Sequence, residues 1–124
     1  NLIDTLNIAV EIGNKEIFEL LLNHEGITLG DSVFKKCILL TNMTIPSTFS
    51  YIGKSAFEGC YNLKRVIIPS SITSIGNLAF CDCKSLEKII IPLSVTTIGN
   101  FAFSNCELIT KIIIPPSITK IEDQ

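Results

Sequence analysis

Cysteine is the residue type in this sequence whose spacing most suggests chemistry. Four of the five cysteines, Cys37, Cys60, Cys83 and Cys106, occupy every twenty-third position, and Cys81 stands two positions before Cys83. An odd number of thiols at one long step is not the pattern of a secreted disulfide framework. Cys-x-Cys in a chain with a single histidine is not zinc-ligand spacing either. We therefore expect these side chains to pack as small apolar groups, with no metal or other cofactor.

No other set of side chains has the spacing of a catalytic or phosphate-binding site. His24 is the only histidine, so a Ser-His-Asp or Cys-His arrangement has one candidate at most. Its place after a run of leucines suits the carboxyl end of a helix. Gly53, Gly76 and Gly99 occur singly, unlike the clustered glycines of a phosphate-binding loop. We therefore predict that the chain is not an enzyme and has no small-molecule substrate.

Composition and charge are typical of an ordered protein without a polyanionic partner. The chain has 124 residues, of which 47% are hydrophobic and 18% charged, and its formal net charge is −2. Because no basic excess would attract phosphate backbones, we do not expect nucleic acid as a partner. The mean hydropathy of +0.46 is high, but no apolar run approaches the ~20 residues of a membrane span. The sequence starts at Asn1 without a signal peptide, and we expect it to be a piece of a longer protein.

One fixed period organises most of the sequence, since residues of like type recur at every twenty-third position. Isoleucine followed by proline recurs in this way, at Ile45, Ile68, Ile91 and Ile114. The same period links the glycines, alanines, phenylalanines and cysteines: Gly53, Gly76 and Gly99; Ala56, Ala79 and Ala102; Phe34, Phe57, Phe80 and Phe103; Cys37, Cys60, Cys83 and Cys106. Each unit is too small to bury its own apolar side, so the units must stack and place like residues in columns. We predict about four 23-residue coils from residue 28 onward, the last one incomplete and without a visible C-terminal cap.

Each coil is expected to contain one strand, one turn and one helical turn. The β-branched residues around Val66 and Ile68 alternate as in a short strand, and Pro69 ends it because proline cannot donate to a ladder. Gly76 permits a turn with positive φ, and residues 79–83 suit a single helical turn on the other side. Stacked coils would then form one parallel sheet with strands about 4.8 Å apart.

The repeated pattern Ala-Phe-x-x-Cys-x-x-Leu-x-x-Ile-x-Ile-Pro-x-Ser-Ile-x-x-Ile-Gly resembles the BspA-type leucine-rich repeats. One copy of it is carried by Ala79, Phe80, Cys83, Leu86, Ile89, Ile91, Pro92, Val95, Ile98 and Gly99. The resemblance covers roughly residues 28–122 and implies an α/β fold, a right-handed leucine-rich-repeat solenoid. In such a solenoid two sets of residues would be structural: Phe57, Phe80 and Phe103, and Cys60, Cys83 and Cys106. Proteins of this family are known as microbial surface antigens and adhesins that bind host or matrix proteins, so the resemblance implies protein binding and no catalytic residue.

Residues 1–26 break the period and resemble one ankyrin unit. A first helix would carry a face with Leu6 and Ala9, a Gly13-Asn14 turn would follow, and a second helix would end in a run of leucines. Asn7 departs from the ankyrin pattern, where histidine is usual, and the proline expected after the first threonine is missing. The unit is either the tail of an upstream ankyrin array or a helix pair that covers the open end of the solenoid, and we expect both in one fusion. We therefore assign 1–27 to an ankyrin-like helical hairpin and N-terminal cap, and 28–124 to the solenoid.

Two columns of side chains on the strands form the candidate binding surface. If Val66 and Ile68 point into the core, the residues beside them point to an open, concave face. One column is basic (Arg65, Lys88 and Lys111, preceded by Asn42), and the next is apolar (Ile67, Ile90 and Ile113, preceded by Thr44). BspA-type repeats usually have a polar residue at the second position, so three isoleucines in register indicate a contact surface, and the basic column would steer an acidic partner. The alternative is that β-branched residues only favour the strands and that a flanking segment covers them.

These features predict a non-catalytic interaction or scaffold module that binds an acidic protein partner through its concave face. Reduced thiols and the ankyrin-like unit favour a cytoplasmic location. The known members of the resembled family, which are surface proteins, favour the cell surface instead, with a role as an adhesin or surface antigen. A third alternative is a structural component of a larger assembly, such as a cytoskeletal one.

Overall fold

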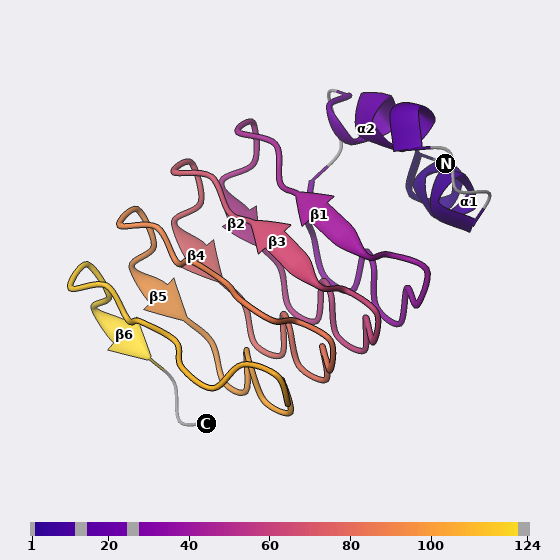
Figure 1. Ribbon diagram of the computed structural model, residues 1–124. Coiled ribbons are helices and arrows are strands. Elements are labelled where there is room, and N and C mark those ends of the chain that lie inside the picture. The colour runs from indigo at the N-terminus through magenta and orange to yellow at the C-terminus, as the bar shows by residue number, and fades with distance from the viewer. Residues whose placement is uncertain (1, 12–14, 25–27, 122–124) are drawn as a thin grey trace.

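The chain is a stack of flat coils with two helices at its amino-terminal end (Figure 1). The structure is a computed structural model that describes residues 2–11, 15–24 and 28–121, so the expected Gly13-Asn14 turn lies outside the described residues. The described part forms two helices and six short strands: α1 (Leu2–Glu11), α2 (Lys15–Leu22), β1 (Asn42–Thr44), β2 (Tyr51–Ile52), β3 (Arg65–Ile67), β4 (Ser74–Ile75), β5 (Thr97–Ile98) and β6 (Lys120–Ile121). Within this part, neither helix has the length and hydropathy that crossing a membrane requires.

Residues one period apart lie opposite each other on neighbouring parallel strands. β1 pairs with β3, with Asn42 opposite Arg65. β2, β4, β5 and β6 pair in that order, with Tyr51 opposite Ser74 and Ser74 opposite Thr97. The predicted stacking of coils through parallel, in-register strands is therefore confirmed.

The single sheet that we predicted is wrong, because each coil adds a second strand. After the proline turn, in which Ile72 N donates to Pro69 O at 3.2 Å, the chain enters another ladder, where Gly76 N donates to Ile52 O at 2.8 Å. The described strands therefore form two sheets, β1-β3 and β2-β4-β5-β6. Only an isolated bridge to Lys88 continues the first sheet beyond β3, and residues 108–114 form no strand.

The third side of each coil consists of tight turns and not of the helical turn that we predicted. Cys83 N donates to Phe80 O at 3.2 Å, whereas Phe80 N donates to Ala102 O of the next coil at 2.8 Å. Positive φ angles of 61° at Leu78 and Asp82 permit this alternation, whereas a helix directs its N–H groups along its own axis. The described part of the solenoid has no helix, so the α/β character of the chain comes from α1 and α2.

Gly76 is needed for close contact between coils and not for the positive φ that we predicted. Among the described glycines only Gly59 has a positive φ, of 74°. A Cβ atom at Gly76 would lie 2.7 Å from Lys54 N and 2.8 Å from the carbonyl carbon of Gly53. The glycine column therefore sets how closely the coils approach one another.

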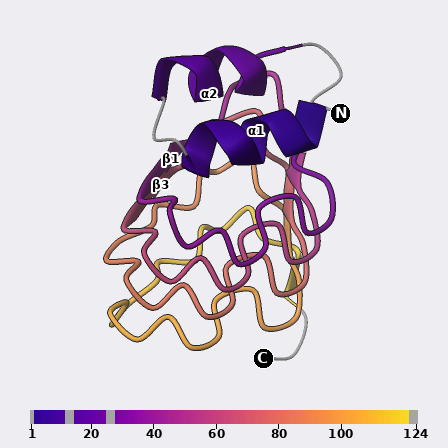
Figure 2. The same cartoon turned by 90° about the vertical axis from the view of Figure 1, so that its right-hand side faces the viewer.

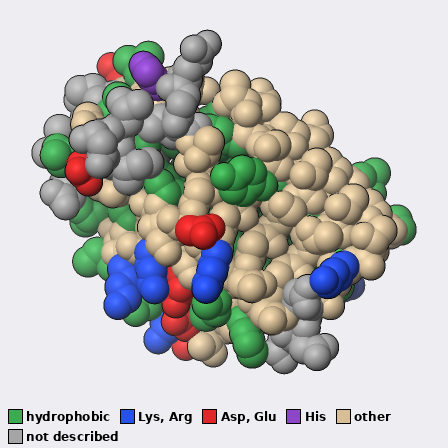
Figure 3. All heavy atoms as spheres, turned by 180° about the vertical axis from the view of Figure 1, so that it is seen from behind, with side chains coloured by type: hydrophobic (Ala, Val, Ile, Leu, Met, Phe, Trp, Pro, Cys, Tyr) green, Lys and Arg blue, Asp and Glu red, His purple; other side chains and the backbone are tan. Residues whose placement is uncertain are grey.

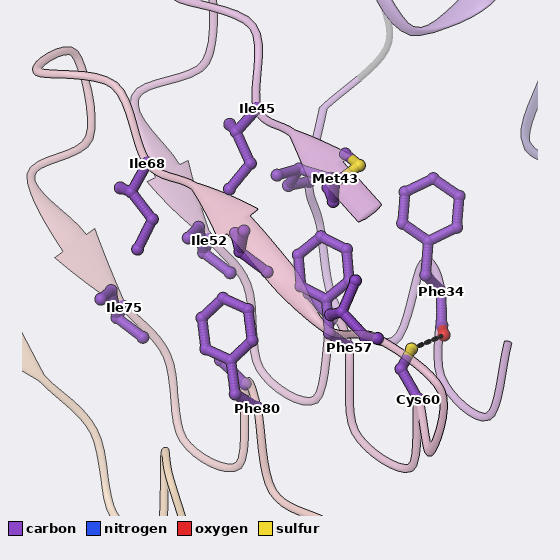
Figure 4. Close-up of a cluster of buried hydrophobic side chains, with 14 of the residues drawn as sticks. Phe34, Met43, Ile45, Ile52, Phe57, Cys60, Ile68, Ile75 and Phe80 are labelled. Carbon is purple, nitrogen blue, oxygen red and sulfur yellow. Dashed lines mark hydrogen bonds between the residues drawn. The ribbon is translucent and has the colours of Figure 1, made fainter. Parts of the chain in front are cut away.

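Columns of apolar side chains fill the interior between the two sheets and the turns (Figure 4). The rings of Phe34, Phe57, Phe80 and Phe103 stack with centroid distances of 5.6, 5.2 and 5.5 Å. The helices belong to the same core, since Leu6, Ala9 and Leu22 are buried in the cluster that contains these rings. Figure 2 shows α1 and α2 lying across this end of the stack.

Candidate functional site

The cysteine column is part of the core and has no feature of a reactive site. Cys60, Cys83 and Cys106 are buried, and each Sγ donates a hydrogen bond to a phenylalanine carbonyl of the preceding coil, at 3.1, 3.2 and 3.1 Å. Figure 4 shows the first of these bonds, from Cys60 to Phe34. Burial raises the pKa of the Cys60 thiol to about 12 and that of Cys106 to about 11, so both are protonated and poorly nucleophilic at neutral pH.

Our sequence interpretation treated these thiols as apolar and missed their role as donors. One signal in the sequence pointed to this role: cysteine occurs in all four coils, although alanine or valine would also fill a small apolar site.

Cys81 lies next to Asp82 in the sequence. Its pKa is also raised, mainly by burial and further by the nearby carboxylates. Within the described residues no three His, Cys, Asp or Glu side chains are placed to hold a metal ion, and His24 is exposed just beyond α2.

The front face, which carries the isoleucine column (Ile67, Ile90 and Ile113) and the basic column (Arg65, Lys88 and Lys111), is open to solvent. On β1 and β3 the outer residues are exposed and the middle one, Met43 or Val66, is buried. The three isoleucines are 63%, 68% and 74% exposed. β1 and β3 pair in register, which places like residues about 4.8 Å apart. Beyond β3 only the bridge between Arg65 and Lys88 continues this pairing, so the two columns follow successive coils without a continuous ladder.

The basic column has no acidic partner within the described part of the chain. The ion pair recorded there joins Lys35 to Glu58, at 3.6 Å, on the turns away from this face. Lys84 lies 5.6 Å from the centre of the Tyr61 ring, also away from the front face. The charges of the basic column are therefore available to a ligand.

A groove separates β3 from the next segment of the front face. It has a volume of about 580 Å³. Its lining residues come from two neighbouring coils and are Arg65, Val66, Ile67, Ile68, Glu87, Lys88 and Ile90. The groove exists where regular pairing stops after one bridge, so the two segments diverge. Our sequence interpretation did not include Glu87, because strand alternation would place it on the side of Ile89, which is buried, and yet Glu87 is exposed and lines the groove.

The outer side of the β2-β4-β5-β6 sheet has a different chemistry. A ladder of threonines runs along it: Thr73 Oγ1 donates to Ser50 O at 3.1 Å, Thr96 Oγ1 to Thr73 O at 3.3 Å and Thr119 Oγ1 to Thr96 O at 3.1 Å. Seen from behind, most of the surface over the coils is neither hydrophobic nor charged (Figure 3). The hydroxyl protons of this ladder are already used within the protein.

Stacked parallel strands, buried phenylalanine and cysteine columns and one open sheet face define a leucine-rich-repeat solenoid. The family model for the BspA type leucine rich repeat region matches residues 13–124 in six copies, and the chain belongs to this family. No curated protein sequence matches the chain.

Solved bacterial structures share this fold. A leucine rich repeat protein of T. pallidum is 31% identical over 82% of this chain, with a TM-score of 0.77, and one from Bacteroides ovatus is 38% identical over 78%, with a TM-score of 0.74. A leucine rich cell surface protein from Faecalibacterium prausnitzii is 36% identical over 67%, with a TM-score of 0.64. The matches cover 49%, 25% and 22% of those proteins, so this chain spans half of their length or less.

The comparisons do not support three of our sequence interpretations. The family match counts six copies where we predicted about four coils, and it begins at residue 13, so that it includes α2. No comparison supports an ankyrin unit at the amino terminus. The comparisons do not support the predicted cytoplasmic location either, since the neighbour whose location is given is a cell surface protein.

Proposed function

We propose that this chain is a non-catalytic module that binds a protein partner through its front face. The observation that carries the proposal is the isoleucine column, with three large apolar side chains at least 63% exposed in neighbouring coils. Core packing does not need Ile67 or Ile90, because the residues on either side of each already fill the interior: Val66 and Ile68, and Ile89 and Ile91. Contiguous exposed apolar groups of this kind usually mark a contact surface.

Burial of this column supplies a large part of the energy that a specific complex needs. Burying one isoleucine fully is worth about 1.5–3 kcal/mol. Three would contribute about 5–9 kcal/mol, compared with about 8 kcal/mol for a micromolar complex, before the entropic cost of association is subtracted. The remaining affinity would come from polar contacts at the edges of the face.

The charge of the front face favours an acidic partner. Three basic side chains, Arg65, Lys88 and Lys111, stand against one acidic side chain, Glu87, in a chain whose net charge is −2. An acidic protein would be attracted to this face and oriented on it.

A triple variant, Ile67→Thr, Ile90→Thr and Ile113→Thr, tests the proposal. Threonine keeps the β-branched shape that strands favour, so folding should be preserved. The matched control is Ile38→Thr, Leu39→Thr and Leu108→Thr, which removes three apolar side chains of 51%, 53% and 54% exposure from the turns. In pull-downs from the native host, partners that the wild type retains should be lost with the first variant and kept with the control. Retention by both variants, with unchanged melting temperatures, contradicts the proposal.

A cell-surface location is our second proposal, and the similarity to the F. prausnitzii cell surface protein supports it. Three of the free thiols do not argue against an oxidising environment, since Cys60, Cys83 and Cys106 are buried. Protease treatment of intact host cells should remove the protein, and full protection until the cells are lysed would contradict this location.

A further inference from the structure

We infer that residues 19–21 can leave α2 and add a strand to the free edge of β1, parallel and in register. The amino-terminal end of the stack would then have two conformations, one with a helix and one with a further strand. Three observations support this switch: the phase of the repeat, the open edge of β1 and the exposure of the leucines in α2. The proposed function does not depend on it.

The repeat continues upstream of β1 without a change of phase. Gly53 N donates to Leu29 O at 2.6 Å, just as Gly76 N donates to Ile52 O one coil later at 2.8 Å. Leu29 is buried, so the chain already holds a coil position there. Residues 19–21 stand one period of 23 residues before β1, where the front strand of this coil would lie. The family match includes these residues, since it begins at residue 13.

The leucines of α2 stand at strand positions of the repeat. Leu20 aligns with Met43, one period later. Leu22 aligns with Ile45 in the same way, and both of these later residues are buried in the core. In α2 Leu20 is instead 74% exposed, whereas Leu21 packs partly against the core and Leu22 is buried. A strand would bury Leu20, expose Leu21 and keep Leu22 inside. The two conformations therefore bury similar amounts of apolar surface, as a two-state element requires.

The edge of β1 that faces the amino-terminal end is open (Figure 1). β1 is an edge strand, since its sheet has the order β1-β3, and such a strand presents unpaired N–H and C=O groups. Ile45 N donates to Ile67 O at 3.1 Å. Because alternate residues of a parallel strand bond to opposite sides, Asn42 and Thr44 direct their backbone groups to the open side. In the described part of the chain no Cα atom of α1 or α2 lies within 8 Å of one in β1, so neither helix pairs with this edge.

Residue types explain why these residues form a helix in the structure. α2 consists mostly of lysine, glutamate and leucine, which are good helix formers. Asn23 stands where the later coils have Pro46 and Pro69 at the end of the strand. Its backbone N–H donates to Glu19 O at 3.2 Å and so extends the helix by one bond. The missing proline thus favours the helix, although the leucines keep the pattern of a strand.

The switch would change the front face at its amino-terminal end. In the strand Leu21 would precede Thr44 and Ile67 in the row of outward residues. Glu19 would precede Asn42 and Arg65 in the neighbouring row. Unwinding of α2 would therefore lengthen the face by one apolar and one acidic side chain.

Asn23→Pro tests the switch on the whole chain. Proline removes the N–H that Asn23 donates to Glu19, and it disfavours the helical conformation at Leu22. It also restores the residue that ends the strand in the later coils. The matched control is Leu20→Pro, which breaks the helix too but removes an N–H that the added strand would donate to Asn42.

Amide hydrogen exchange measures the strand, and far-UV circular dichroism measures the helix. We expect both variants to lose helical signal, and exchange at the Thr44 amide to slow at least tenfold in Asn23→Pro alone. The Ile45 amide, which is bonded to Ile67, should stay protected in both and shows that the coils remain folded. Loss of helical signal in Asn23→Pro without protection of Thr44 overturns the inference.

A disulfide trap keeps the inference testable if Asn23→Pro unfolds the chain. Leu21→Cys with Thr44→Cys joins positions one period apart, whereas the control, Leu20→Cys with Thr44→Cys, joins positions that the strand would place on opposite faces. Both pairs are made with Cys37→Ala, because Cys37 is the native thiol that is only half-buried. Cysteines whose Cα atoms are more than about 7 Å apart cannot be bridged without movement of the backbone, so neither pair closes while α2 stays in place.

We expect the first pair to form its disulfide at least tenfold faster than the control pair under the same oxidant, as measured by mass spectrometry. Equal rates in the two pairs, or no disulfide in the first, overturn the inference.

Discussion

The rings of Phe57 and Phe80 lie 5.2 Å apart with an angle of 4° between their planes, although a full repeat of the sequence separates them. The Cys83 Sγ of one coil donates to the carbonyl of Phe57 in the preceding coil, at 3.2 Å. Ring stacking and the thiol bond therefore join the same two coils. Because these inward side chains hold the coils together, the outward residues of the strands are not needed for stacking and can serve binding.

Close contact at the glycine column predicts a strong asymmetry between two glycine substitutions. Gly76→Ala should lower the free energy of unfolding by about 2–3 kcal/mol, because its Cβ would lie 2.7 Å from Lys54 N. Gly30→Ala should change it by less than about 0.5 kcal/mol, because the nearest atom to its Cβ, Thr28 Oγ1, is 3.6 Å away. Urea unfolding of both variants checks this. Equal effects would contradict the role that we assign to the column.

The buried thiols predict a loss of stability in mild alkali. Burial raises the pKa of Cys60 to about 12 and of Cys106 to about 11, from 9.0. As the pH rises, the thiols of the unfolded chain lose their protons before those of the folded chain. The stability that the buried thiols contribute is therefore complete below pH 9 and decreases as the pH rises towards 11. At pH 10 each thiol should reduce the free energy of unfolding by about 1 kcal/mol.

Urea unfolding at pH 8, 9 and 10 measures this decrease, and Cys106→Ala serves as the control. The variant lacks one of the thiols, so its stability should depend less on pH over the same interval. An identical dependence in both proteins would show that other groups cause the loss.

The basic column predicts binding that depends on salt. In pull-downs from the native host, Lys88→Glu should reduce the amount of partner retained at least tenfold at low ionic strength, and the difference should shrink near 1 M salt, where the Debye length is about 3 Å. Lys120→Glu, on the other sheet, is the matched charge change and should have little effect. A loss that is independent of salt would indicate that Lys88 acts through structure and not through charge.

The sequence was sufficient to predict the register of the coils and the outward direction of Ile67 and Ile90. Both follow from a fixed period and from the alternation of strands, and the hydrophobic residues on either side of each isoleucine show this alternation directly. The role of the outward residues in binding remains a prediction.

The second sheet and the turns could not be predicted, because they have little signal in residue type. β4 has only two residues, Ser74 and Ile75, which is too short for an alternating pattern. Leu78 and Phe101 adopt positive φ angles of 61° and 57°. Large side chains such as these rarely do so, and their local propensity therefore did not predict these turns. Contact with the next coil determines these conformations, and that contact is a property of the stack.

The most direct test of the central claim is a photo-crosslinking amino acid placed at Ile90 and, separately, at Thr96. Both positions are exposed, and they lie on different sides of the same coil. In the native host, position 90 should crosslink to a specific protein and position 96 should not. Equal crosslinking from both positions, or crosslinking from position 96 alone, would contradict a binding role for the front face.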